Sequence, residues 1–295
     1  MPNVICFLLS YILLLVMELI RGKYPVGQLG TVLTRLLLVA ATIAVFTHSL
    51  YLLDRLFLAL ANEESPLYLS WHDWGTLSSW MLATAYYTML LRRPNNRIGI
   101  FVIPMLILLV GGTFLLPSDI GIRNSSASGW RLAHGVGMTL GTMLISLGMA
   151  MAIMYFIQSS WLRSTRPRRF KLQLPSLEYL ESFGRKCLLG SAASIGFGMV
   201  SGVIMNIVKD GQVEWLDRGI LFSGGLFLWL ITASIIQWQF SQRGRGQSTA
   251  AMNIVSFVVV VAALALVLST PHGSNTIPDA KPISDQSDSI EKDLR

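Results

Sequence analysis

Apolar runs separated by short polar stretches make up most of the chain. Eight runs are long enough to cross a hydrocarbon core of about 30 Å as helices that rise about 1.5 Å per residue. The runs cover residues 4–20, 33–53, 68–91, 98–116, 131–157, 186–207, 219–240 and 250–269. This pattern predicts an all-α integral membrane protein, a polytopic bundle of about eight transmembrane helices.

The run that begins near residue 131 orients the others. It has no charged residue between Gly135 and Ile157, and the basic stretch 163–171 follows it. Positively charged connections resist translocation and stay in the cytoplasm. When the runs alternate across the membrane, the basic stretches 21–35 and 92–97 fall on that same side. We therefore expect both termini outside, in a membrane such as the bacterial inner membrane.

The composition agrees with this interpretation. Of 295 residues, 53% are hydrophobic and only 13% are charged, whereas a soluble domain carries about 25% charged residues. The net charge of +7 could indicate nucleic acid, but the basic residues lie in short connections, where topology explains them. We expect a single transmembrane domain over 1–270, embedded in a lipid bilayer, and an external disordered tail over 271–295.

Small residues recur at intervals of four in two of the runs. Gly137 and Gly141 have this spacing, and so do Ser194, Gly198 and Gly202. Small residues at this interval let two helices approach closely in lipid. The spacing predicts helix packing at these positions.

The chain has four histidines, and all four fall near the predicted outer face: His48, His72, His134 and His272. An imidazole in lipid usually faces the bundle interior or water, and neutral imidazole is a common ligand of haem iron. Each histidine alone could be an interfacial residue without a ligand. Their grouping on one side favours a shared site.

Motifs for other chemistry are missing from the sequence. It contains no HExxH, no Walker glycine loop and no GxSxG. The runs hold no paired carboxylates, which argues against a proton-coupled transporter. We assign no catalytic residue and expect an assembly or binding protein more than an enzyme.

Several segments in the second half follow one another in an informative order. LAHGVGMTLGTMLISLGMAMAIMYFIQ (132–158) is followed by LPSLEYLESFGRKCLLGSAASIGFGMVSGVI (174–204). A tryptophan-containing loop, SQRGRGQSTAA (241–251) and a last apolar run ending near His272 come next. In this order residues 130–273 resemble the cytochrome c assembly protein family, the haem-handling CcsA and ResC proteins and their HemX-type relatives.

The resemblance implies haem handling at the outer face of the membrane. Family members present haem to apocytochrome c, with axial histidines on either side of a tryptophan-rich loop. His134 and His272 match those metal ligands by position, and Trp215 matches a tryptophan of the loop. The resemblance also implies a second, membrane-embedded ligand pair, which His48 and His72 could match.

The tryptophan-rich loop departs from the family. The family sequence reads approximately WGxxWxWDPKE, whereas residues 211–219 read GQVEWLDRG. This shortening favours the HemX-type branch of the family.

Two functions remain open. The chain could bind or handle haem in cytochrome c biogenesis, together with other cytochrome c maturation proteins. Alternatively, it could be a HemX-like, non-catalytic scaffold or regulator whose basic stretch 163–171 holds a soluble enzyme of tetrapyrrole metabolism. A small-solute transporter is a third option. Sequence alone does not separate the first two, because a bis-histidine haem site and two solvated histidines have the same residues.

Overall fold

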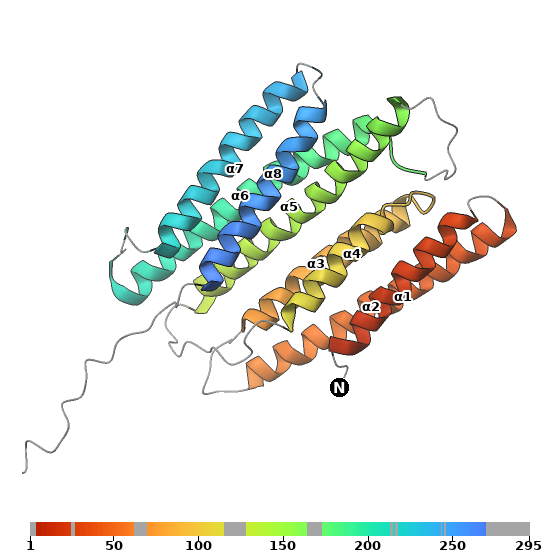
Figure 1. Cartoon of the computed structure of the whole chain (residues 1–295). Coiled ribbons are helices and arrows are strands. Elements are labelled where there is room, and N and C mark those ends of the chain that lie inside the picture. Colours follow the sequence, from red (N-terminus) through yellow and green to blue (C-terminus); the bar gives the residue numbers. More distant parts are fainter. Residues whose placement is uncertain are drawn as a thin grey trace, which may run out of the picture.

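The described part of the chain forms eight helices and contains no strand (Figure 1). The computed structural model describes residues 4–24, 27–61, 70–114, 128–163, 173–212, 215, 218–242, 244 and 246–269. The helices are α1 (Val4–Lys23), α2 (Gln28–Ala61), α3 (Trp71–Arg92), α4 (Gly99–Thr113), α5 (Ser128–Arg163), α6 (Leu177–Asp210), α7 (Arg218–Gln242) and α8 (Gly246–Ser269). The expected all-α bundle is confirmed.

Six of the described helices are long and apolar enough to cross a membrane, namely α1, α2, α5, α6, α7 and α8. Helix α4 is apolar but has only 15 residues, so it is about 22 Å long. Helix α3 has 22 residues and begins with the polar sequence WHDW. The chain is therefore an integral membrane protein, with α3 and α4 packed among the longer helices.

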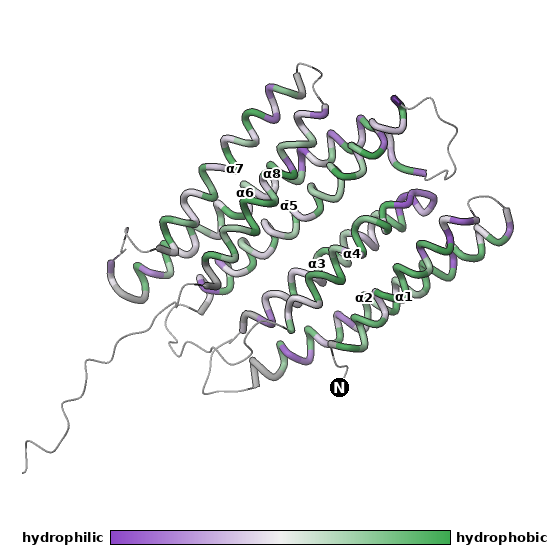
Figure 2. The backbone as a smooth tube through the Cα atoms, viewed as in Figure 1, coloured by the Kyte–Doolittle hydropathy of each residue, from purple (hydrophilic) through white to green (hydrophobic). Residues whose placement is uncertain are grey.

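Large apolar side chains cover the outside of the bundle. Leu9 of α1, Phe46 of α2 and Leu228 of α7 are 59%, 60% and 67% exposed. Figure 2 shows hydrophobic residues along most of each helix, with hydrophilic residues gathered near the helix ends. Exposed apolar surface of this extent is unfavourable in water, so these faces contact the lipid tails.

The helices form two groups that follow the order of the chain (Figure 1). In the first group α1 packs against α2 and α4, and α3 packs against α2 and α4. In the second group α5, α6 and α8 all pack against one another, and α7 covers α6 and α8. The groups meet where α3 and α4 contact α5.

Helix α6 begins at Leu177, earlier than the apolar run that starts at residue 186. Ser176 caps the helix, because its hydroxyl accepts a hydrogen bond from the backbone N–H of Tyr179 at 3.3 Å. The first turns of α6 are polar, and they extend the helix beyond the segment that hydropathy marks.

A buried ion pair connects α1 to the turn between α3 and α4. The guanidinium of Arg21 donates to the Glu18 carboxylate at 2.7 Å, to the Pro94 carbonyl at 2.6 Å and to the Asn96 carbonyl at 3.1 Å. Glu18 and Arg21 are 0% and 1% exposed. Arg97 is buried beside them, and burial lowers the pKa of its guanidinium, as does the neighbouring Arg21 charge, whereas Glu18 raises it.

The same turn reaches the second group of helices. The backbone N–H of Arg97 donates to the Gln173 carbonyl at 3.1 Å. The guanidinium of Arg93 lies 4.4 Å from the centroid of the Tyr179 ring, near the start of α6, which is a cation–π contact. The α3–α4 turn therefore joins α1 to the segment that leads into α6.

Candidate functional site

The site that the structure describes best is His134, in the second turn of α5. Its Nδ1 lies 2.7 Å from the carbonyl oxygen of Gly198 on α6. The ring is only partly buried, so it lies at the edge of the helix interface and not in its centre. Helix α6 thus holds this imidazole in a fixed orientation.

Glycines make this approach of α6 to His134 possible. A Cβ on Gly202 would lie 2.8 Å from Nδ1 of His134, and a Cβ on Gly137 would lie 2.8 Å from Cα of Gly198. One helical turn further along, the Ser191 hydroxyl donates to the Gly141 carbonyl at 2.8 Å. The packing that the spacing of small residues predicts is therefore present between α5 and α6.

The hydrogen bond to Gly198 determines where the neutral imidazole of His134 carries its proton. A carbonyl oxygen can only accept, so Nδ1 must be the protonated nitrogen. The lone pair is then on Nε2. An imidazole whose Nδ1–H is held by a backbone carbonyl and whose Nε2 is unprotonated can ligate a metal through Nε2.

A tryptophan from the first helix group packs against Gly135, the residue that follows this histidine in the chain. The indole of Trp74 on α3 fills the space next to Gly135, where any side chain would overlap it. Trp74 was not among the residues that the sequence suggested for the site. The segment SWHDW does not predict this contact, because Trp74 and Gly135 belong to different helices that are about 60 residues apart in the sequence. 

His48 lies in a different environment, between α2 and α1. It is 0% exposed, its Nδ1 is 2.9 Å from the Tyr11 hydroxyl, and its ring is stacked on Phe7 at 4.1 Å between centroids. Helix α2 contacts α1 and α3 but not α5 or α6. The structure therefore does not bring His48 to His134, and both faces and edges of the His48 ring are enclosed.

His72 lies in the first turn of α3, next to an aspartate that is already bonded. Asp73 accepts from Arg55 Nε at 3.0 Å and from the Ser70 hydroxyl and N–H at 2.8 and 2.9 Å. Nδ1 of His72 is 4.0 Å from the Asp73 carboxylate, which is beyond hydrogen-bond distance. The His72 side chain is 16% exposed, and its role as a second ligand stays a prediction.

Two residues of the predicted haem site cannot be placed against His134. His272 lies outside the described residues. Trp215 is described and is 66% exposed, but its neighbours on both sides in the loop are not described. Within the described ranges, no three His, Cys, Asp or Glu side chains gather as metal ligands.

The fold defines the class of protein, an all-α integral membrane bundle. Comparison with protein-family models gives no match, and neither a curated protein nor a solved structure matches the chain.

Proposed function

We propose that this chain is a membrane protein of cytochrome c biogenesis that binds haem near the outer face of the membrane. The observation that supports the proposal is the hydrogen bond that orients the His134 ring. The hydrogen bond from Nδ1 to the Gly198 carbonyl leaves Nε2 to ligate iron.

The proposal also gives roles to residues other than His134. Met138 lies one turn further along α5 and packs, partly buried, against the α5–α8 core. His272 would supply the second ligand, and Trp215 would lie along the macrocycle. Bound haem would supply the iron and the vinyl groups that attach to apocytochrome c, and this chain would hold and orient it.

Absorption spectroscopy of the purified full-length protein tests the proposal. We expect a Soret band in the wild-type protein and its loss in His134→Asn. An asparagine amide can still donate to the Gly198 carbonyl, but it has no atom that replaces Nε2. Loss of the band in a variant that keeps the same unfolding temperature therefore identifies a ligand and not a packing residue.

Thr142→Ala is the matched control on α5. The Thr142 hydroxyl bonds only within its own helix, to the Thr139 carbonyl at 2.9 Å, so this variant should keep the Soret band. A wild-type protein that stays colourless after haem is added would contradict the proposal. That result would favour the scaffold function, in which the basic stretch 163–171 holds a soluble enzyme of tetrapyrrole metabolism.

A further inference from the structure

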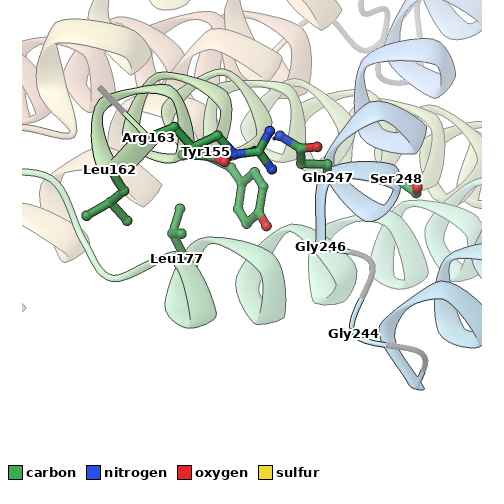
Figure 3. A pocket seen from close by; sticks show the side chains of 9 residues that line it. Tyr155, Leu162, Arg163, Leu177, Gly244, Gly246, Gln247 and Ser248 are labelled. Atoms are coloured by element: carbon green, nitrogen blue, oxygen red, sulfur yellow. Dashed lines mark hydrogen bonds between the residues drawn. The ribbon is translucent and has the colours of Figure 1, made fainter. Parts of the chain in front are cut away.

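The described part of the chain contains polar side-chain atoms that are enclosed and have no hydrogen-bond partner. Such atoms are uncommon in folded proteins, and a bound ion or water is a usual explanation for them. None of them belongs to the residues that line the pocket between α5, α6 and α8, where Arg163 and Gln247 lie side by side (Figure 3). Four of the seven gather instead around the α3–α4 turn: Oε2 of Glu18, Nε of Arg21, the hydroxyl of Tyr86 and Nη1 of Arg97.

These four residues come from three parts of the first helix group. Glu18 and Arg21 lie near the end of α1, Tyr86 lies on α3, and Arg97 lies in the turn before α4. All four are nearly sealed from solvent, with exposed fractions of 0%, 1%, 3% and 4% in that order. A buried donor or acceptor without a partner is costly, so this cluster is where the first helix group most needs an additional hydrogen-bonding partner.

Gly99, the first residue of α4, shows that two of the groups border the same space. A Cβ on Gly99 would lie 2.9 Å from the hydroxyl oxygen of Tyr86 and 3.2 Å from the carboxyl carbon of Glu18. The hydroxyl and Oε2 of Glu18 are nevertheless not bonded to each other. The guanidinium of Arg97 is close enough to act electrostatically on both Glu18 and Arg21.

The charges around this space decide what kind of molecule suits it. Oε2 of Glu18 only accepts hydrogen bonds, Nη1 of Arg97 only donates them, and the Tyr86 hydroxyl does both. The carboxylate repels an anion, and the two guanidinium groups repel a cation. A neutral molecule that both donates and accepts suits all of these groups, and their enclosure requires a small one.

We propose that this cluster binds a water molecule. The water donates to Oε2 of Glu18 and exchanges hydrogen bonds with the Tyr86 hydroxyl and with Nη1 of Arg97. About three bonds of this kind are usual for a buried water. Arg21 links α1 only to the α3–α4 turn, and the water adds α3 to that connection. The site neither needs haem nor depends on the proposed function.

Water-edited solid-state NMR of the full-length protein in lipid bilayers tests the proposal, because it measures how fast magnetisation passes from water to a labelled side chain. With tyrosine labelled at Cζ, we expect fast transfer to Tyr86 and slow transfer to Tyr11. Tyr11 is the matched control, since it is 1% exposed and its hydroxyl is bonded to Nδ1 of His48 at 2.9 Å. The exposed Tyr24 shows that transfer is detected. Transfer to Tyr86 as slow as that to Tyr11 would overturn the site.

A pair of variants tests the part of Arg97 in the site. Arg97→Met keeps the length of the side chain and removes the donor, so transfer from water to Tyr86 should become slower. Arg92→Met makes the same change at an exposed position at the end of α3, and it should leave the transfer unchanged. Unchanged transfer in Arg97→Met, or an equal loss in both variants, would overturn the arrangement.

Replacing chloride by gluconate distinguishes water from a bound anion. The unfolding temperature of the wild-type protein should be the same in the two salts, because a water site contains no exchangeable ion. A lower unfolding temperature in gluconate that disappears in Arg97→Met would mean that the cluster binds chloride. That result would overturn the water site.

Discussion

Arg21 illustrates how a single charged residue is accommodated inside the bundle. It is 1% exposed, and its guanidinium reaches the Glu18 carboxylate and the carbonyls of Pro94 and Asn96. Among the described residues, Oε2 of Glu18 and Nε of Arg21 have no hydrogen-bond partner. Removing charges from water is costly, so the contribution of this pair to stability depends on both members being present.

We expect Arg21→Met to destabilise the protein by about 3–5 kcal/mol, because it removes the charge that is hydrogen-bonded to the buried Glu18 carboxylate and leaves only Arg97 nearby. The measurement is the free energy of unfolding in mild detergent. The double variant Glu18→Gln with Arg21→Met should be more stable than Arg21→Met alone. If the double variant were the less stable one, Glu18 would not depend on Arg21 for its charge compensation.

At the scale of the elements, glycines line the contact between α5 and α6. The backbones approach so closely at Gly137 and Gly198 that an added Cβ would meet backbone atoms and not the end of a flexible side chain. Helix α8 also packs against glycines, at the other end of the α5–α6 pair. Its Asn253 is 2% exposed and lies against both Gly148 and Gly184.

Gly137→Val should therefore destabilise the protein by about 1–3 kcal/mol, as overpacking does in a tightly packed core. Thermal unfolding in detergent measures the effect. Gly111→Ala on α4 is the control, because a Cβ there meets nothing within 4 Å. That variant should be neutral or slightly stabilised, since alanine favours a helix more than glycine does. Equal losses in both variants would mean that the α5–α6 contact has no special role.

The sequence predicted the elements better than the contacts between them. Hydropathy marks all eight helices, and the spacing of Gly137, Gly141 and Gly198 predicts that their helices pack closely. The partners of Arg21 could not be predicted, because a backbone carbonyl such as that of Pro94 carries no signal in the side-chain pattern. For the same reason the Gly198 carbonyl that fixes the tautomer of His134 appears only in the structure.

At the scale of the whole molecule, we expect the positions of the charges to set the orientation in the membrane. The basic connections lie between α1 and α2, between α3 and α4, after α5 and between α7 and α8. Successive helices run in opposite directions (Figure 1), so α1, α3, α5 and α7 all end at the same end of the bundle. Positively charged connections stay in the cytoplasm.

A topology reporter fused after Arg245 should therefore behave as cytoplasmic, and one fused after Ser274 as external. The physical reason is the resistance of basic connections to translocation. Paired phosphatase and fluorescent-protein fusions measure it. The reverse result at both positions would place His134 on the cytoplasmic side and would remove the basis for haem handling at the outer face.

The ion pair of α1 also has a consequence for the order of events during synthesis. Glu18 is three residues from Arg21, so it can neutralise the guanidinium as soon as α1 is helical. The carbonyls of Pro94 and Asn96 come more than 70 residues later, after α2 and α3 have left the ribosome. Until then Arg21 has its bond to Glu18 but not its bonds to Pro94 and Asn96. A chain that stops before the α3–α4 turn never forms the last two bonds. In such a chain the guanidinium of Arg21 has Glu18 as its partner and lacks the two carbonyls that the completed fold supplies.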